Sequence, residues 1–150
     1  MQFLEIFNNP ILGVTLLAPF IAQLIKLPLD FIRTRRWNWY LILEPGGMPS
    51  SHSALVTAAA HAIGLWVGFA SPLYALAFGL CIIVIYDATG IRRQAGMHAE
   101  IINRMIQELA SGHPLKSQEL REVLGHTPLE ALAGVLIGLL VAQVSYLLMK

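Results

Sequence analysis

The chain has 150 residues, of which 56% are hydrophobic and only 13% are charged. A water-soluble domain of this size carries a smaller apolar fraction and a larger charged one. The composition therefore excludes a soluble enzyme or binding domain and predicts a single membrane domain over residues 1–150. The net charge is +1, and the one cysteine, Cys81, lies in an apolar run and provides no disulfide framework.

Four segments are apolar enough to cross a bilayer as helices, which takes about 20 residues each. We expect these spans at 10–31, 53–70, 72–90 and 128–149. Somewhat shorter segments can also span when flanking groups help their ends. The sequence therefore predicts four transmembrane helices.

The segment between the third and fourth spans has apolar residues along one side of a helix and mostly polar or charged side chains along the other. The apolar positions are Met97, Ile101, Ile102, Met105, Ile106 and Leu109. This pattern predicts an amphipathic helix at 93–110 that lies in the membrane interface. The expected fold class is all-α, with four transmembrane helices plus one interfacial amphipathic helix.

Basic residues are distributed unevenly once the four spans are threaded alternately through the membrane. Nine of the ten fall on the face that holds the 33–49 loop and the 90–127 segment, namely Lys26, Arg33, Arg35, Arg36, Arg92, Arg93, Arg104, Lys116 and Arg121. Only Lys150 lies opposite. The positive-inside rule predicts a multi-pass cell-membrane protein with this face in the cytoplasm, although cations that bind an anion would produce the same bias.

The stretch GGMPSSHS, residues 46–53, stands directly before the second expected span. Its glycines and proline favour a tight turn, and Ser50 or Ser51 can cap the helix that follows. His52 would then lie in the first helical turn, where backbone N–H groups and the helix dipole favour an anion. Capping alone explains the serines, but a histidine there can also donate a proton to a bound phosphate.

Other cations and histidines are expected at the same membrane face, each at a helix end. Lys26 and Arg33 close the first span, Arg92 and Arg93 follow the third, and His126 precedes the fourth. Their convergence predicts an anion site, although basic residues also gather at cytoplasmic helix ends without binding a ligand.

His126 and Glu130 stand four positions apart, which places the carboxylate one helical turn from the imidazole. A carboxylate there can accept the imidazole N–H and make the other ring nitrogen a better nucleophile. The alternative is a first-turn acid that is favoured only by the helix dipole. Gly134 and Gly138 continue this face and predict the close approach of another helix, from this chain or from a second copy.

In this order, these residues resemble the three-part signature of the type 2 phosphatidic acid phosphatase superfamily. The matching positions are Lys26, Arg33, Pro49, Ser50, Ser51, His52, Arg92, His126, Glu130, Gly134 and Gly138. The segments 86–96 (YDATGIRRQAG) and 124–128 (LGHTP) resemble more closely the divergent branch described as related to acid phosphatases and vanadium-dependent haloperoxidases. The resemblance to this branch covers nearly the whole chain.

The superfamily resemblance implies a metal-independent phosphatase that needs no cofactor. It implies that His126 attacks phosphorus and forms a phosphohistidine, that Glu130 orients it, and that His52 protonates the leaving oxygen. It also implies a set of phosphate ligands: Lys26, Arg33, Arg92 and the backbone N–H groups around Ser50 and Ser51. Such a set suits phosphoryl transfer, which depends mainly on positioning and on neutralising charge on the phosphoryl oxygens.

Several positions depart from the superfamily pattern. Ser51 replaces glycine, Glu130 replaces aspartate, and a threonine follows Arg33 where proline is expected. Thirty-three residues separate Arg92 from His126, whereas the superfamily has five between its arginine and its histidine. This insertion contains the amphipathic segment and leaves the relative placement of the two residues open, so the residue after Arg92, also an arginine, competes for the same role.

One further histidine satisfies that spacing literally, because five residues separate Arg92 from His98. His98 is the alternative nucleophile, ranked second because Ile102 occupies the position where an orienting acid would follow. Asp87 has two roles open to it: it orients Arg92 or Arg93, or it marks the end of the third span.

The expected substrate is a lipid phosphate or diphosphate, because the site lies where a headgroup sits while the tail stays among the membrane lipids. No nucleic-acid partner is expected. Two other functions stay open. One is a protein that binds or transports a lipid phosphate without cleaving it, and the other is a structural subunit that packs through Gly134 and Gly138 against a partner or itself.

Overall fold

The computed structural model describes residues 2–42, 47–110 and 126–150. Within these ranges the secondary structure is entirely helical, with five α-helices and two short 3₁₀ helices. In chain order they are η1 (Gln2–Asn8), α1 (Pro10–Thr34), η2 (Trp39–Ile42), α2 (Ser51–Val67), α3 (Pro72–Thr89), α4 (Ile91–Ala110) and α5 (Pro128–Met149). The prediction of an all-α chain is confirmed for this part of the protein.

Four of the α-helices begin at a polar residue that caps them. The caps of α1, α2, α3 and α5 are Asn9, Ser50, Ser71 and Thr127, and each side chain accepts a hydrogen bond from the backbone N–H three residues later. A proline stands at the start of α1, α3 and α5, where its missing N–H costs nothing. These local signals explain why the helices start where they do.

Helix α2 lies at the centre of the bundle and packs against α1, α3 and α5. The buried core at these contacts consists almost entirely of small side chains: Val14, Ala18 and Ala22 from α1, Ala54, Ala58 and Ala62 from α2, and Ala142 from α5. Small residues allow helix backbones to approach closely, which is how helices commonly associate inside a membrane. The position of α2 is therefore set by close backbone packing on several sides.

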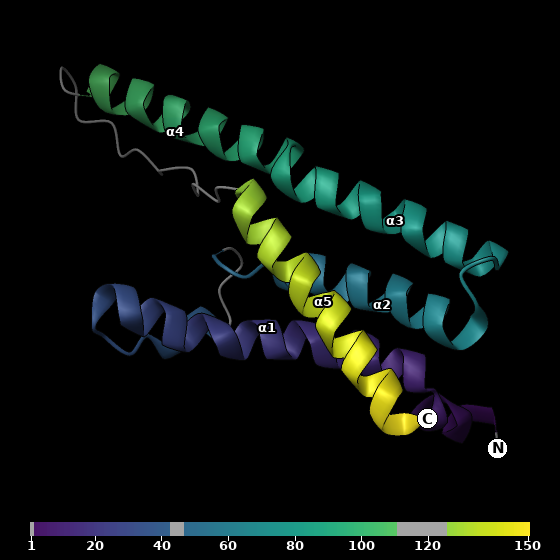
Figure 1. Ribbon diagram of the computed structural model, residues 1–150. Helices are drawn as coiled ribbons and strands as arrows, with labels where there is room; N and C mark the ends of the chain where they lie inside the picture. The colour runs from purple at the N-terminus through teal and green to yellow at the C-terminus, as the bar shows by residue number, and fades with distance from the viewer. Residues whose placement is uncertain (1, 43–46, 111–125) are drawn as a thin grey trace.

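The helix ends are sorted between the two ends of the bundle (Figure 1). Both termini and the connection between α2 and α3 lie at one end. The starts of α2 and α5 and the end of α3 lie at the other. The segments that carry the candidate site residues are thus brought to a common end.

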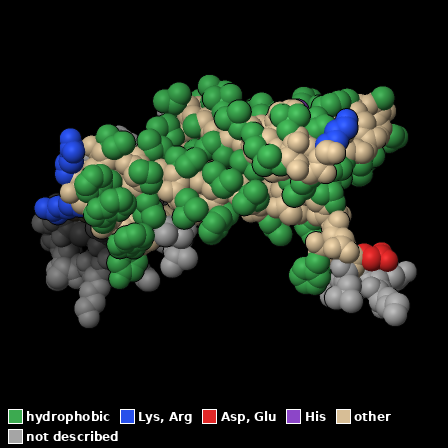
Figure 2. All heavy atoms as spheres, turned by 60° about the horizontal axis from the view of Figure 1, so that its bottom comes forward, with side chains coloured by type: hydrophobic (Ala, Val, Ile, Leu, Met, Phe, Trp, Pro, Cys, Tyr) green, Lys and Arg blue, Asp and Glu red, His purple; other side chains and the backbone are tan. Residues whose placement is uncertain are grey.

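Among the described residues, three helices are long and apolar enough to cross a membrane: α1 over Pro10–Ile32, α3 over Pro72–Thr89 and α5 over Pro128–Met149. Hydrophobic side chains cover the middle of the face in Figure 2, and the charged side chains on this face lie toward its ends. Large apolar residues on α1, α3 and α5 are exposed, as expected where lipid replaces water as the solvent. The prediction of a membrane protein is confirmed at the level of three candidate spans.

Helix α4 starts immediately after Gly90 and continues roughly in the direction of α3 (Figure 1). It includes the whole of the predicted helix 93–110 and begins two residues earlier. Apolar side chains such as Ile101 and Met105 are exposed on it, whereas Asn103 is buried. The helix exists as predicted, and its place in the membrane interface stays a prediction.

Candidate phosphate site

The starts of α2 and α5 are joined to each other and to the end of α3 by backbone hydrogen bonds. The Ser50 N–H donates to the Glu130 carbonyl oxygen over 3.0 Å. The His126 N–H donates to the Ala88 carbonyl oxygen, also over 3.0 Å. Three segments that are far apart in the sequence therefore meet at one point.

Two glycines of α5 allow this helix to lie directly against α2. A Cβ atom at Gly134 would collide with the Ser50 carbonyl oxygen, and one at Gly138 would lie 2.6 Å from the Ala54 carbonyl oxygen. Real Cβ atoms essentially never approach other atoms so closely. The glycine face predicted for helix packing is thus occupied by α2 of the same chain, which accounts for it without a second copy.

His52, in the first turn of α2, and His126, just before the cap of α5, bring their rings close together. Their ring centroids are 6.4 Å apart, and the ring planes are inclined by 53°. His52 is exposed, whereas His126 is buried, with 6% of its surface accessible. A nucleophile and a general acid each need to come within about 3 Å of a reacting atom. The separation of the two rings therefore suits a single phosphoryl group between them.

The Glu130 carboxylate holds His126 in a defined orientation. Its Oε2 atom lies 3.3 Å from His126 Nδ1 and accepts a 3.0 Å hydrogen bond from the Thr127 N–H. The Thr127 hydroxyl accepts in turn from the Glu130 N–H, which completes a capping box. Because an ionised carboxylate can only accept, a hydrogen bond here requires the proton on His126 Nδ1, and in a neutral ring this leaves the lone pair on Nε2. Glu130 thus contacts the imidazole as predicted and, as a first-turn acid of α5, also closes the capping box.

Ser50 and Ser51 differ in what their polar groups contact. The Ser50 hydroxyl is fully buried and accepts hydrogen bonds from the Ser53 N–H and hydroxyl, at 3.3 and 3.1 Å. Its N–H is bonded to α5, so Ser50 joins the two helices rather than offering donors to a ligand. Ser51 is the first residue of α2, and the helix itself supplies no acceptor for its N–H. Ser51 stays the expected backbone donor to phosphate.

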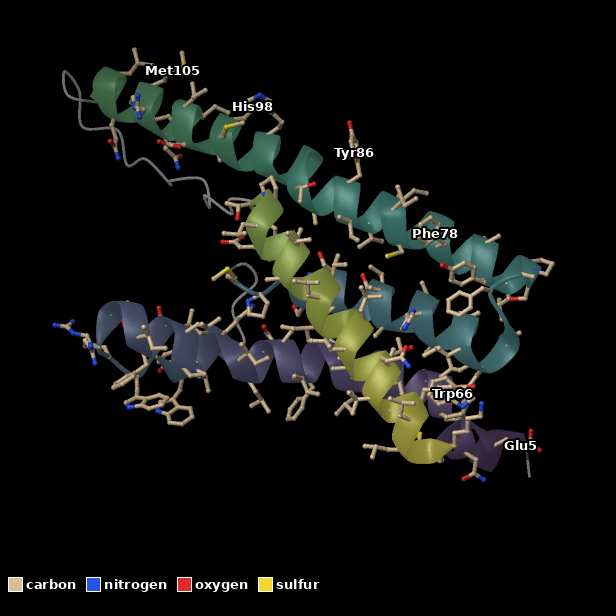
Figure 3. All side chains as sticks on the ribbon, viewed as in Figure 1. Glu5, Trp66, Phe78, Tyr86, His98 and Met105 are labelled. Carbon is tan, nitrogen blue, oxygen red and sulfur yellow. The ribbon has the colours of Figure 1, made fainter. Side chains whose placement is uncertain are left out.

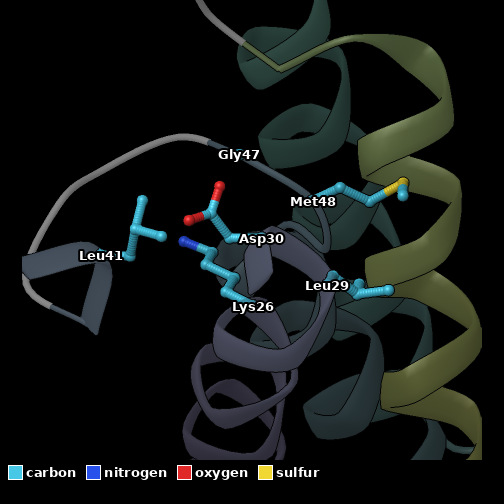
Figure 4. A pocket seen from close by; sticks show the side chains of 6 residues that line it. All are labelled: Lys26, Leu29, Asp30, Leu41, Gly47 and Met48. Carbon is cyan, nitrogen blue, oxygen red and sulfur yellow. The ribbon is translucent and has the colours of Figure 1, made fainter. Parts of the chain in front are cut away.

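Lys26 lies in a small pocket between α1 and the segment that carries Gly47 and Met48. Only 4% of the residue is exposed, and the pocket has a volume of about 90 Å³. Figure 4 shows Lys26 and Asp30, one turn apart on α1, in the space beneath the segment that carries Gly47 and Met48. A buried cation and an acidic side chain of α1 thus line the same pocket.

The predicted arginine ligands belong to helices α1 and α4, but their side chains lie outside the described part of the structure. Arg33 is in the last turn of α1, and Arg92 and Arg93 are in the first turn of α4. Their contacts with phosphate stay predictions. Asp87 stands in the last turn of α3, next to Ala88, whose carbonyl oxygen binds the His126 N–H. This places Asp87 beside the site, and both of its proposed roles stay open.

The alternative nucleophile, His98, is not brought to the same place. It is exposed on α4, and Figure 3 shows it on the outer side of that helix, away from α5. His126 is instead the histidine that meets both His52 and a carboxylate. His98 has the superfamily's spacing from Arg92, but the two histidines whose rings come together are His52 and His126.

Two neighbours of the site were not among the predicted site residues. Ser53 bonds to Ser50 inside the protein, and Asp30 shares the pocket of Lys26. Both could have been found by spacing, because Ser53 stands three residues after a helix cap and Asp30 stands four after Lys26. Within the described ranges, no three His, Cys, Asp or Glu side chains come together as a metal site would require.

Comparison with known proteins confirms the family resemblance that the sequence motifs indicate. The sequence model of the Divergent PAP2 family matches residues 7–141. The chain is 39% identical over 152 aligned residues to the "Uncharacterized membrane protein YuiD" of Bacillus subtilis (strain 168), and the match covers 94% of this chain and 96% of that protein. No solved structure matches the chain.

Proposed function

Because the chain belongs to the Divergent PAP2 family, we propose that it is a membrane phosphatase that hydrolyses a lipid phosphate or diphosphate through a phosphohistidine. The observation that carries this proposal is the histidine pair, with ring centroids 6.4 Å apart and a carboxylate on Nδ1 of one ring. One histidine is held as a nucleophile, and the other is exposed beside it as a proton donor.

In the proposed reaction, His126 Nε2 attacks phosphorus while the bond from phosphorus to the lipid oxygen breaks. Protonated His52 gives its proton to that oxygen, so the lipid leaves as an alcohol or, from a diphosphate, as a monophosphate. Water then attacks the phosphohistidine, and His52 takes a proton from it. Phosphate is released, and both histidines return to their starting states. General acid catalysis of this kind contributes a factor of roughly a hundred to ten thousand.

The phosphoryl oxygens would be neutralised by cations at the same helix ends. Lys26, Arg33 and either Arg92 or Arg93 are the proposed ligands, together with the Ser51 N–H. Buried Lys26 suits this role because a cation in a water-poor site acts on an anion more strongly than one in bulk water. Orientation of the arginines would fall to Asp87.

The proposed membrane arrangement has four crossing helices, with α2 as the fourth. Its 17 residues reach about 26 Å, slightly less than the hydrocarbon core, and neighbouring helices surround it. The histidine pair then lies near one membrane surface, where a lipid headgroup sits. The positive-inside rule favours the cytoplasmic surface. The amphipathic helix α4 would rest at that surface.

Phosphate release by the purified, detergent-solubilised protein tests the proposal. The panel comprises phosphatidic acid, a polyprenyl phosphate and a polyprenyl diphosphate, without added metal and with orthovanadate as the competitor. Wild type is compared with His126→Ala and His52→Ala, and His98→Ala is the matched control. Each histidine variant is expected to lower vanadate-sensitive release at least about a hundredfold, with the control unchanged.

Other outcomes would redirect the proposal. Loss of release in His98→Ala alone would move the nucleophile to α4. If a folded wild-type protein binds these lipids without releasing phosphate, the function is binding or transport of a lipid phosphate. Trapping a labelled phosphoryl group on wild type but not on His126→Ala would identify the covalent intermediate directly.

A further inference from the structure

A second pocket, larger than that of Lys26, lies between α2, α3 and α5. It has a volume of about 250 Å³ and is lined mainly by apolar side chains. Each helix contributes a stripe along one face: Thr57 and His61 on α2, Cys81 and Ile85 on α3, and Leu139 on α5 are members. The pocket therefore follows the helices along the apolar depth of the bundle.

The pocket reaches the surface that faces lipid. Thr57 and Cys81 are buried at its base, whereas Phe78 and Ile82 line it while about half exposed. The contact between α3 and α5 is sparse compared with the contact of either helix with α2. The pocket thus opens sideways between α3 and α5, with α2 as its floor.

The same pocket leads toward the histidine pair. On α3 its lining ends at Ile85, three residues before Ala88, whose carbonyl oxygen holds the His126 backbone. On α5 it begins at Val135, five residues and about 7.5 Å beyond Glu130. Both helices therefore place the pocket below the candidate phosphate site, on the side of the apolar core.

Three of the side chains that line the pocket, Thr57, His61 and Cys81, have polar partners. The Thr57 hydroxyl lies 3.5 Å from the Cys81 sulfur, and His61 Nε2 lies 3.1 Å from the Gln143 side-chain oxygen. Apart from these groups and the hydroxyl of Tyr74, the lining consists of hydrocarbon side chains such as Leu139. Such a wall suits an apolar chain better than a polar ligand.

We propose that this pocket holds the hydrocarbon chain of the lipid phosphate while its phosphoryl group lies between His52 and His126. The proposal rests on the phosphatase function proposed above and adds a determinant of chain length to it. Chains long enough to reach from the headgroup to Ile82 gain contacts that shorter chains do not make.

Two adjacent isoleucines of α3 provide a matched test. Ile82 and Ile83 are both exposed toward lipid, but of the two only Ile82 lines the pocket. Ile82→Trp would block the mouth from the rim without overfilling the core, and Ile83→Trp adds the same bulk elsewhere. The substrates are dioleoyl phosphatidic acid and dihexanoyl phosphatidic acid, which share a headgroup and differ in chain length.

Ile82→Trp is expected to lower kcat/KM for the dioleoyl substrate about tenfold, because loss of even one methylene contact in an apolar pocket has an effect of this order. The dihexanoyl substrate should be affected much less, and Ile83→Trp should change neither value. If the two variants cleave the dioleoyl substrate equally well, the chain lies elsewhere and the proposal is wrong.

A second measurement does not depend on catalysis. Cys81 is the one cysteine of the chain and lines the pocket, so its alkylation by N-ethylmaleimide reports on occupancy. In inactive His126→Ala protein, dioleoyl phosphatidic acid should slow alkylation more than dihexanoyl phosphatidic acid or dioleoyl phosphatidylcholine. Equal protection by phosphatidylcholine would assign the pocket to bulk lipid and overturn the proposal. Protection without phosphate release by wild type would instead retain the pocket and reject the phosphatase function.

Discussion

Replacement of Gly138 by alanine is expected to push α5 away from α2. The added Cβ would lie 2.6 Å from the Ala54 carbonyl oxygen and 2.9 Å from the Ala58 nitrogen, whereas ordinary contact begins at 3.4 Å. Both neighbours are backbone atoms of a packed helix and cannot rotate aside. The helices must therefore separate by roughly 0.8 Å or distort locally, as overfilled cores do.

The cost of this change can be estimated from two opposing effects. Overpacking costs about 1–3 kcal/mol, and contact with rigid backbone places Gly138 near the upper value. Alanine recovers up to about 1 kcal/mol of helix propensity. The free energy of unfolding should fall by about 2 kcal/mol in Gly138→Ala. Gly79→Ala in α3 is the matched control, because nothing lies within 4 Å of its Cβ.

The assay is thermal unfolding of both purified variants in the same detergent, together with phosphate release. Gly138→Ala should have the lower Tm and the lower rate, because the contact between α2 and α5 also holds His52 opposite His126. Equal Tm and equal rates for the two glycine variants would refute the close approach of the helices and its role in the site.

Three further substitutions separate stability from activity. Glu130→Gln keeps an oxygen for the Thr127 N–H but removes the charge beside His126, so phosphate release should fall at least about tenfold with little change in Tm. Ser50→Ala leaves the buried Ser53 N–H without its cap and should cost about 1–2 kcal/mol in chemical or thermal unfolding. Lys26→Met removes a buried charge, so KM for a lipid phosphate should rise while Tm stays equal or increases; an unchanged KM would exclude Lys26 as a ligand.

Much of the fold could be read from the sequence because the signals are local. Apolar runs, the prolines that begin three helices and the serine or threonine caps determine where helices form, whatever packs beside them. The contact between His126 and Glu130 was also predicted from their spacing of four, although His126 precedes α5 and its cap Thr127, so the two meet at the start of the helix rather than along a helical face. The glycine spacing predicted close helix packing, but not that α2 of the same chain would be the partner.

What the tertiary structure decided is which helix ends meet. Thirty-three residues separate Arg92 from His126, and no local sequence pattern predicts where the chain rejoins the helix bundle after a segment of this length. His126 and His98 were both open as the nucleophile; backbone bonds from Ser50 to α5 and from His126 to α3 bring His126 close to His52, whereas His98 lies on the outer side of α4. The same long-range packing turned Ser50 inward and formed the pocket beneath the site. The sequence by itself thus determined the helices and the chemistry at their ends, whereas contacts between distant helices determined which of those ends form one site.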